Sequence, residues 1–452
     1  MMLMPPSIRR RALLLAAAGA GLAPRARGAP AALGLPPLAF QQRRLANGLE
    51  LLSLPMEESA SVSVQLWYRV GGKNDPAGRS GFAHLFEHLM FKSTRYMAAE
   101  QFDRLTEDVG GTNNAFTAED MTVYHSVVPA NHLEPLLWAE AERMAHLNVD
   151  QADFESEREV VKEEYRQRVL ADPYGRLLNA IPAYGYQQHP YKRPVIGSIE
   201  ELDAASLQEV RDFHAAYYRP DNAVLIVSGR FDPARLEQWV EHYFGSIRAP
   251  REPLPRVTVV EPRRLRDERH RLAAPQVPLP AALAIWQGPS AASPDATALQ
   301  VAQGLLALGD SARLNEALVY RQRLAQSTGF DVLLNADAGL LAGYAIAAGA
   351  TRAETLLTQL VREIERLAEE PVAPEELDKV KAQLLTKALI ERETPEGRGL
   401  ALGQALLLRG DAAAAGRELA RLQAVTLADV QRVLRQHVLQ GAKVTVLYGG
   451  RP

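Results

Sequence analysis

Short segments in which apolar and polar residues alternate occur at several places in the chain, and each of them predicts a β-strand. The clearest example lies at residues 62–68, where every second residue is apolar or aromatic, as is typical of a strand that buries one face. The pair Asn47-Gly48 predicts a hairpin turn between two short strands. Residues 222–229 and 442–449 predict two further strands.

Helical periodicity replaces this alternation between the predicted strands. The segment that contains residues 84–88 is patterned like a helix, and residues 154–165 predict a charged helix with an apolar strip. We expect further helices to about residue 215, before the strand at 222–229. The predicted fold class is therefore α+β, with helices packed on one face of a mainly antiparallel sheet.

The second part of the chain repeats the pattern of the first at a constant distance. Residues 206–210 (Ser-Leu-Gln-Glu-Val) correspond to residues 426–430 (Thr-Leu-Ala-Asp-Val), 220 positions later. The strand at 222–229 corresponds to 442–449 at the same distance and without a gap. A constant separation of this kind predicts two copies of one domain.

The boundary between the two copies is marked by prolines. Three of them cluster within residues 248–256, which is typical of a linker. We therefore expect an N-terminal domain at residues 38–248 and a duplicated C-terminal domain at residues 257–450.

Residues 1–31 have the character of a signal peptide. A basic start that includes Arg9-Arg10-Arg11 precedes a short apolar core and a stretch of small residues. The adjacent arginines are compatible with a twin-arginine export signal as well as with an ordinary secretory signal. An uncleaved anchor helix is the alternative, but the apolar core is short for a membrane span. The predicted location is outside the cytoplasm, in the periplasm.

Composition excludes several classes of function. The 51 basic and 54 acidic residues nearly balance, and no basic block suggests a nucleic-acid partner. No internal apolar run is long enough to span a bilayer. The chain has no cysteine, so it has neither disulfides nor thiolate metal sites.

The stretch His84-Leu85-Phe86-Glu87-His88 carries the candidate chemistry. On a helix, His84 and His88 lie one turn apart on the same face, where two imidazole nitrogens can bind one zinc ion. Glu87 lies near this face and can reach a water at the metal. The order H-x-x-E-H is typical of inverted zinc peptidases. The alternative is a pair of ordinary histidines on a surface helix.

A catalytic zinc ion needs a third protein ligand and one open position. Glu157 and Glu164 are two helical turns apart on the predicted helix at 154–165 and therefore share a face. One of them can bind the metal while the other holds a histidine N–H. Taken alone, such a glutamate-rich helix is more often a solvated surface.

These motifs resemble the pitrilysin family of zinc peptidases, which includes insulin-degrading enzyme and the mitochondrial processing peptidases. The match is to the half-length bacterial members. The resemblance implies that His84, His88 and Glu164 bind one Zn²⁺ per chain, that Glu87 is the general base, and that Glu157 supports a ligand. It also implies a fold of two duplicated domains that forms half of a clamshell.

The resemblance implies substrate-binding residues in both copies. The family binds the peptide backbone on an edge strand, which corresponds here to Asn114, Ala115, Phe116 and Thr117. An Arg–Tyr pair contributes from the opposite half of the clamshell, and Arg313 and Tyr320 have its spacing. The alternative for this pair is a salt-bridging arginine and a core tyrosine. A homodimer, or a heterodimer with a paralogous subunit, would complete the enclosed chamber.

The second copy lacks the candidate metal site. At the constant separation that relates the two copies, His84, Glu87, His88 and Glu164 correspond to Gly304, Ala307, Leu308 and Leu384. The fold therefore does not require the polar residues, and we expect the first copy to hold the chemistry.

The predicted function is that of a zinc-dependent endopeptidase, a hydrolase of extended or unfolded peptides. Two alternatives remain open: a metal-binding subunit that needs a paralogous partner, and a non-catalytic assembly subunit. An intact Glu87 argues against a purely structural role, since a structural site has no use for a base.

Overall fold

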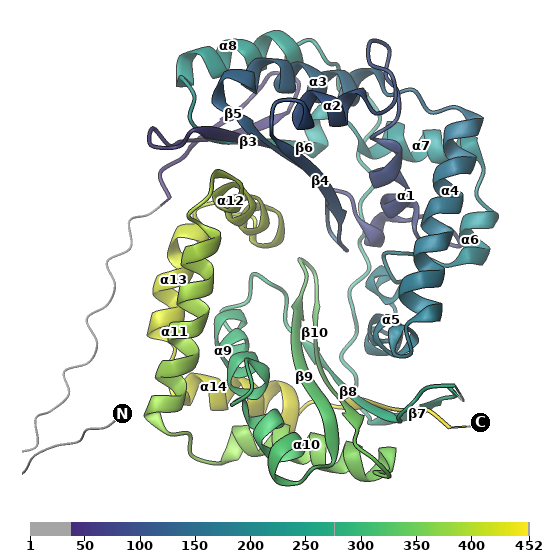
Figure 1. The fold of residues 1–452 in the computed structure, drawn as a ribbon, viewed down its shortest axis with the longest axis vertical. Helices are drawn as coiled ribbons and strands as arrows, with labels where there is room; N and C mark the ends of the chain where they lie inside the picture. The colour runs from purple at the N-terminus through teal and green to yellow at the C-terminus, as the bar shows by residue number, and fades with distance from the viewer. Residues whose placement is uncertain (1–37, 275, 451–452) are drawn as a thin grey trace, which may run out of the picture. The chain divides into compact units, whose positions relative to one another are not determined.

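The computed structural model describes residues 38–450 with the exception of residue 275. The predicted signal peptide, residues 1–31, lies outside the described residues. Two β-sheets with their helices account for the regular structure of the described part (Figure 1). No helix among the described residues is long and apolar enough to cross a membrane.

The first sheet has six strands in the order β1-β2-β6-β3-β5-β4. Their bounds are β1 (Gln41–Arg44), β2 (Glu50–Pro55), β3 (Ser61–Tyr68), β4 (Thr112–Thr117), β5 (Thr122–Pro129) and β6 (Ala223–Gly229). Every pairing is antiparallel except that of β2 with β6. The turn at Asn47-Gly48 joins β1 to β2 as predicted, with Gly48 at a positive φ of 93°.

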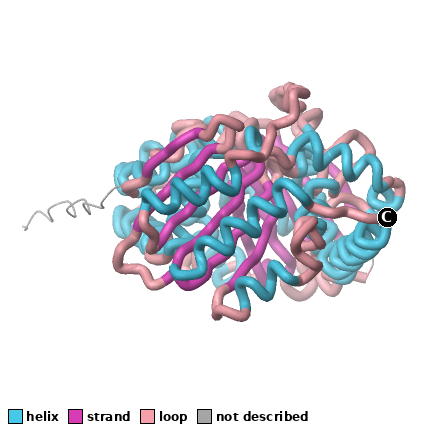
Figure 2. The backbone as a smooth tube through the Cα atoms, turned by 90° about the horizontal axis from the view of Figure 1, so that it is seen from above, coloured by secondary structure: helices cyan, strands magenta, loops and turns pink. Residues whose placement is uncertain are grey.

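The described part of the first half contains eight α-helices, several of which cover one face of this sheet. They are α1 (Phe82–Leu89), α2 (Gln101–Glu107), α3 (Leu133–His146), α4 (Gln151–Tyr165), α5 (Gly175–Gly185), α6 (Ile199–Asp203), α7 (Leu207–Tyr217) and α8 (Pro233–Phe244). Apolar residues of α1, α3, α7 and α8 form one buried cluster with the side chains of β3 that point to their face. Figure 2 shows the strands running side by side beneath helices.

The second sheet repeats the first. Its strands are β7 (Glu268–Leu272), β8 (Ala281–Gly288), β9 (Ala325–Leu334), β10 (Gly339–Ala347) and β11 (Lys443–Tyr448), in the order β7-β11-β8-β10-β9. This order matches β2-β6-β3-β5-β4 strand for strand, with one parallel pair at the same place. Strand β8 begins and ends 220 residues after β3, which is the separation found between the two copies in the sequence. The predicted duplication and the α+β class are confirmed.

The helices that belong to the second half follow the same chain order. They are α9 (Ala296–Ala307), α10 (Ala353–Glu369), α11 (Pro374–Glu391), α12 (Pro395–Arg409), α13 (Ala414–Ala424) and α14 (Leu427–Leu434). Helices α9, α10 and α14 form a buried cluster with one face of the second sheet. Helices α5 and α12 begin at Gly175 and Pro395, which differ by the same separation, and therefore occupy equivalent places in the repeat.

Each half uses one of these two helices to cover the free face of the other half's sheet. Leu402, Ala405 and Leu406 of α12 pack against the first sheet in a cluster that includes Trp67. Leu177 and Ile181 of α5 pack in the same way against the second sheet. The chain thus buries both faces of the central strands of both sheets.

This arrangement corrects one prediction from the sequence. Alternation at residues 62–68 predicted a strand with one buried face, but Ser63, Gln65 and Trp67 on the other face are also fully buried. Their polar groups find partners, because Gln65 Nε2 donates to the carbonyl of Glu396 at 2.8 Å and Trp67 Nε1 donates to Gln65 Oε1 at 3.1 Å. The alternation did not reveal this cover because α12 comes from the other half of the chain.

Two glycines allow α12 to approach the sheet closely. A Cβ atom at Gly399 would lie 2.5 Å from Nε2 of Gln65, and one at Gly403 would lie 2.3 Å from the Trp67 ring. The helix begins with Pro395 in its first turn and a cap in which the Thr394 hydroxyl accepts from Gly397 N at 3.0 Å. It ends at Gly410, whose φ of 71° suits a glycine.

We expect Gly403→Val to destabilise the protein strongly. The added side chain would overlap the Trp67 ring and force α12 from the sheet, which costs about 1–3 kcal/mol for overpacking in a core. Urea unfolding followed by circular dichroism measures the free energy of unfolding. Gln404→Val, at the exposed neighbouring position of α12, is the matched control, and an equal effect of the two variants would contradict the close packing.

Candidate metal centre

Helix α1 presents His84 and His88 on one face, as the sequence predicted. Their ring centroids are 5.1 Å apart. The start of the helix is fixed by Asp75, a buried residue whose carboxylate accepts from Gly81 N at 2.7 Å and from Ala83 N at 2.9 Å. Burial raises the pKa of Asp75 to about 7 despite these hydrogen bonds. Asp75 therefore helps to set the position of both histidines.

Helix α4 brings Glu164 to the two histidines. Its Oε2 lies 3.5 Å from Nε2 of His84 and 3.6 Å from Nε2 of His88. Ligand atoms of all three residues lie within 4.8 Å of one another. Donors bound tetrahedrally to zinc at about 2.0–2.1 Å are themselves about 3.4 Å apart. The three side chains are thus spaced as ligands of one ion, and two imidazoles with a carboxylate suit zinc.

Glu157 occupies the supporting place that the sequence suggested. Its Oε2 lies 3.4 Å from Nδ1 of His88, and its Oε1 lies 2.6 Å from Nζ of Lys92. The hydrogen bond with His88 lowers the pKa of Glu157. A carboxylate on Nδ1 fixes the ring so that Nε2 faces the metal position. Glu157 is therefore a partner of the candidate ligand His88, and Glu164 is the third candidate ligand.

The two histidines differ in their electrostatic surroundings. Burial, together with the charges of His88 and Arg168, lowers the pKa of His84 to about 3. Burial also acts to lower the pKa of His88, but the hydrogen bond to Glu157 and the nearby carboxylates outweigh it, so this pKa is raised. A metal ligand must be a neutral imidazole. His84 is held in this form by its environment.

Arg168 is a member of the site that the sequence did not indicate. Its guanidinium lies 2.6 Å from Oε1 of Glu164. The other oxygen of Glu164, Oε2, faces the histidines. The ion pair orients the carboxylate and offsets part of its charge. Arg168 falls in a π-helical turn at residues 166–171 that continues α4, a winding that the periodicity did not predict.

Glu87 points to the predicted edge strand. The hydroxyl of Thr117 in β4 donates to its Oε2 at 2.6 Å. Burial raises the pKa of Glu87, although this hydrogen bond and the charge of His88 oppose the shift. Thr117 was predicted to bind substrate, and in the structure its hydroxyl contacts the candidate base.

The remaining residues of the edge-strand motif lie where the sequence placed them. Strand β4 is at the edge of the first sheet, paired on one side with β5 only. Asn114 is exposed, and Ala115 and Phe116 are half-buried. Phe116 meets the Trp67 ring edge-on, with centroids 6.1 Å apart. Beside α1, this strand offers an unpaired edge to an extended chain.

Neither Arg313 nor Tyr320 belongs to the group of candidate metal ligands. The Arg313 guanidinium pairs with Glu376, with distances of 2.8 and 2.9 Å to its two oxygens. Tyr320 is 52% exposed, so it is not the core tyrosine of the alternative interpretation. Residues 315–321 form a π-helix, in which a spacing of seven does not keep two side chains on one face as it does in an α-helix. A role for this pair in substrate binding stays a prediction.

Aromatic packing behind α1 holds the helix in place. Phe86 stacks on His214 of α7, with centroids 5.2 Å apart and an interplanar angle of 19°. Tyr218 stacks on the same imidazole. Burial lowers the pKa of His214 to about 4, and its Nε2 has no hydrogen-bond partner among the described residues. His214 is thus a neutral packing residue behind the site.

The sequence matches two models of one peptidase family. Residues 52–198 match the model described as insulinase, peptidase family M16, and residues 204–384 match the model described as the peptidase M16 inactive domain. The first match contains both histidines, Glu87 and Glu164. The second contains all four of their counterparts in the second half.

Proteins similar to this chain include bacterial zinc proteases. Zinc protease PqqE of Helicobacter pylori is 31% identical over 339 residues, which cover 75% of this chain and 76% of that protein. An uncharacterized zinc protease of Mycobacterium tuberculosis is 30% identical over 432 residues, which cover 92% and 94%. The crystal structure of a protease from Helicobacter pylori superposes with a TM-score of 0.88 at 27% identity and covers 92% of this chain and 100% of that chain.

We expect Glu157→Gln to weaken metal binding. The amide cannot hold Nδ1 of His88 as a carboxylate does, and loss of such a partner typically costs about 10–100-fold in metal affinity. Competition with a chromogenic zinc chelator measures the affinity. Glu163→Gln is the matched control, because Glu163 is exposed on the same helix and pairs with Arg166 and Gln167. Equal affinities of the two variants would exclude the assigned role of Glu157.

His214 makes the stability of the fold sensitive to acid. Its folded-state pKa of about 4 lies below the unfolded value, so the unfolded chain binds the proton more tightly, and stability falls as the pH drops from about 6.5 towards 4. At pH 5 the proton uptake of His214 has lowered the free energy of unfolding by about 2 kcal/mol relative to neutral pH. We expect His214→Phe to lose less stability than the wild type between pH 7.5 and pH 5 in urea unfolding. Parallel losses would show that His214 does not titrate in this way.

Proposed function

The chain belongs to the insulinase family of peptidases (M16), and from this premise we propose that it is a zinc-dependent endopeptidase that hydrolyses extended or unfolded peptides. The observation that carries the proposal is the convergence of one ligand atom from each of His84, His88 and Glu164 within 4.8 Å, with Glu87 on the same helix turn as His88. A ligand set that lacked the base would fit a structural ion equally well. The presence of Glu87 favours catalysis.

The three ligands would hold the ion on the face that α1 presents to α4. A bound zinc ion supplies Lewis-acid polarisation of the scissile carbonyl and activation of a water molecule. Lys92 and Arg168 keep the carboxylates of Glu157 and Glu164 in place through ion pairs of 2.6 Å each. The protein thus fixes the donor atoms before the ion binds, which limits the cost of ordering them.

Glu87 is the proposed general base and acid. It takes the proton of the attacking water and delivers it to the nitrogen of the leaving amine. Its burial raises its pKa, and a carboxylate with a raised pKa can both accept and return a proton near neutral pH. Thr117 donates to Oε2 of Glu87 and so leaves Oε1 as the oxygen that meets the water.

Substrate is proposed to bind as an added strand on the open edge of β4. Backbone hydrogen bonds then provide most of the recognition, so an extended conformation matters more than a particular side chain. A folded protein does not present such a segment. This reasoning supports unfolded or extended peptides as the substrate class.

A second subunit is proposed to complete the chamber around the substrate. The partner is either a second copy of this chain or a paralogue, and its Arg313–Tyr320 region is the candidate contribution across the interface. Export to the periplasm, directed by residues 1–31, is part of the same proposal. Light scattering of the purified mature chain, alone and at several concentrations, tests for the dimer.

The central experiment is hydrolysis of a mixture of unfolded peptides by the purified mature chain, read by mass spectrometry. Treatment with a chelator is expected to stop cleavage, and addition of zinc is expected to restore it. Absence of cleavage with a full complement of zinc would favour the alternative, a subunit that needs a paralogous partner.

Glu87→Gln is expected to retain the zinc and lose turnover. The amide cannot accept the proton of the attacking water, and removal of a general base typically costs about 10²–10⁴-fold in rate. Metal content by atomic emission and cleavage of a quenched fluorescent peptide are measured on the same sample. A zinc-loaded variant that cleaves at the wild-type rate would refute the assignment of the base.

A further inference from the structure

The turn between β4 and β5 contains a buried carboxylate, that of Asp120. Its Oδ1 accepts from the hydroxyl of Tyr191 at 2.5 Å and lies 2.7 Å from Nζ of Lys73. Its Oδ2 accepts from Ala336 N at 2.9 Å. A buried carboxylate needs such partners, because an unpaired charge away from water is costly. Asp120 therefore ties the end of the candidate substrate strand to three other segments of the chain.

Two of these partners also hold the turn between β9 and β10 in the second half. Nζ of Lys73 lies 2.9 Å from Oδ2 of Asp337, and the hydroxyl of Tyr191 accepts from Asp337 N at 3.2 Å. Two hairpin turns, one from each half, thus meet at the same group of side chains. The hairpin that carries the candidate substrate edge is anchored to the second half in this way.

Tyr191 belongs to a loop, residues 189–197, whose first residues fix one another. Nδ1 of His189 accepts from Tyr191 N at 3.2 Å, and the centroids of the two rings lie 4.0 Å apart. Burial lowers the pKa of His189, which keeps the imidazole neutral. Burial and the carboxylate of Asp120 raise the pKa of Tyr191. Its hydroxyl therefore keeps the proton that it donates to Asp120.

The same loop contacts the segment that leads into α1. Nη1 of Arg193 donates to the carbonyl of Pro76 at 3.0 Å, next to Asp75, the residue that fixes the start of the helix. Gly197 has a φ of 77°, and a Cβ atom there would lie 2.4 Å from the carbonyl oxygen of Ser80. Only a glycine allows this close approach. The 189–197 loop therefore also sets the position from which α1 begins.

The candidate site needs α1 and β4 at a defined distance from each other. Glu87 comes from α1, and the hydroxyl of Thr117 at the end of β4 donates to its Oε2 at 2.6 Å. Thr117 precedes Asp120 by three residues, so a shift of the turn moves this hydroxyl. The 189–197 loop contacts the turn with one side chain and the approach to α1 with another. One loop thus holds both elements that carry these groups.

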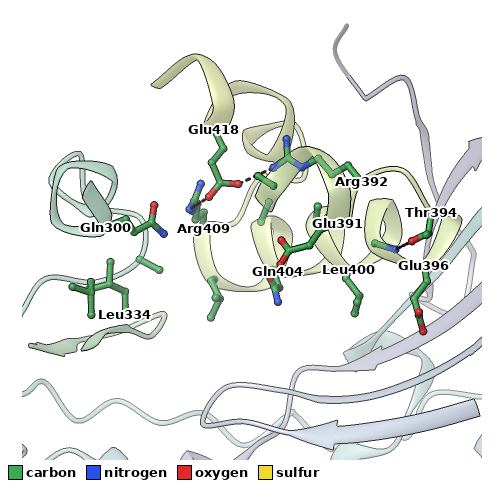
Figure 3. A pocket seen from close by; sticks show the side chains of 17 residues that line it. Gln300, Leu334, Glu391, Arg392, Thr394, Glu396, Leu400, Gln404, Arg409 and Glu418 are labelled. Carbon is green, nitrogen blue, oxygen red and sulfur yellow. Dashed lines mark hydrogen bonds and ion pairs between the residues drawn. The ribbon is translucent and has the colours of Figure 1, made fainter. Parts of the chain in front are cut away.

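A second contact holds the same hairpin farther from its turn. Nδ1 of His125 in β5 lies 2.7 Å from the carboxylate of Glu396, which stands in the first turn of α12 (Figure 3). This contact does not involve Tyr191. Loss of the Tyr191 hydroxyl is therefore expected to loosen the turn and the end of β4 without releasing the hairpin.

The second half does not repeat the side chains of this loop. At the constant separation of the two copies, residues 189–197 correspond to residues 409–417, which contain neither histidine nor tyrosine. Arg409 of this stretch pairs with Glu418 of its own half at 3.1 Å (Figure 3). The histidine and the tyrosine, like the candidate metal ligands, belong only to the first copy. The fold that both copies share therefore does not require them.

We propose that Tyr191, acting through Asp120, is a positioning residue for the reaction, and that the 189–197 loop sets β4 against α1. The inference rests on the proposed peptidase function and names a residue outside the metal centre that governs its rate. Misplacement of a reacting group by about 1 Å costs up to about 100-fold in rate. The candidate ligands come from α1 and α4, so the affinity for zinc is not part of this role.

Hydrogen exchange tests the positioning without any need for turnover. Tyr191→Phe removes the hydroxyl and keeps the ring, and a lost hydrogen bond to a charged group raises the opening equilibrium by about tenfold or more. Exchange of the zinc-loaded mature chain, read by mass spectrometry, is expected to become about tenfold faster at residues 112–121. Tyr448→Phe is the matched control and should leave this exchange unchanged. Tyr448 is also buried and donates across the two halves, to the carbonyl of Pro173 at 2.7 Å.

Steady-state kinetics test the consequence for the reaction. We expect Tyr191→Phe to lower kcat for a quenched fluorescent peptide about tenfold at an unchanged affinity for zinc. Thr117→Val removes the link to Glu87. In that background Tyr191→Phe is expected to lower kcat by less than about twofold, because both changes act on the same contact. A residue that only stabilises the fold would give losses that add.

The inference is overturned by wild-type exchange at residues 112–121 in the folded variant, by a loss of zinc affinity that parallels the loss of turnover, or by additive losses in the cycle. Asp337→Asn, at an exposed position of the turn between β9 and β10, is the second variant if Tyr191→Phe does not fold. It removes the charge paired with Lys73 and is expected to speed the same exchange. If the wild-type protein cleaves no peptide, the peptidase assignment fails, and the exchange measurement alone decides whether Tyr191 positions β4.

Discussion

The whole architecture depends on the reciprocal cover of two sheets by α5 and α12. A sheet whose faces are both apolar cannot stand alone in water, because each face must exclude solvent against another layer. Each half supplies helices for one face of its own sheet and one helix for the free face of the other. The two halves therefore share their cores, and the close contact of Gly403 with Trp67 shows how tightly the exchanged helix is fitted.

Within this framework, the candidate metal centre brings together buried charged groups that compensate one another. Two imidazoles and two carboxylates lie close together, an arrangement that is costly unless each charge is paired or bound to a metal. Lys92 and Arg168 compensate Glu157 and Glu164, while burial keeps His84 neutral. The ligands are thus held ready by pairs that do not occupy the atoms facing the ion. The same arrangement favours Glu164 as the third candidate ligand and Glu157 as the candidate supporting residue.

The comparison of the two halves separates what the fold needs from what the chemistry needs. Strand order and helix positions are the same in both halves, yet the four site positions hold polar residues in one and small or apolar residues in the other. Removal of the metal-binding groups leaves the architecture intact and opens a hollow in their place.

The sequence by itself determined the features that depend on local spacing, because a helix or a strand fixes which neighbours share a face. The H-x-x-E-H helix, the shared face of Glu157 and Glu164 and the duplication follow from these periods and from one constant separation, whereas the edge-strand motif was implied by the resemblance to the peptidase family. Only the tertiary structure decided which distant groups meet, since such contacts arise from shape and charge complementarity that no local period encodes. They include the burial of both faces of β3 and the pairs Arg168 with Glu164, Thr117 with Glu87 and Arg313 with Glu376. The π-helical turns at residues 166–171 and 315–321 also shift side chains away from the faces that an α-helix would give them.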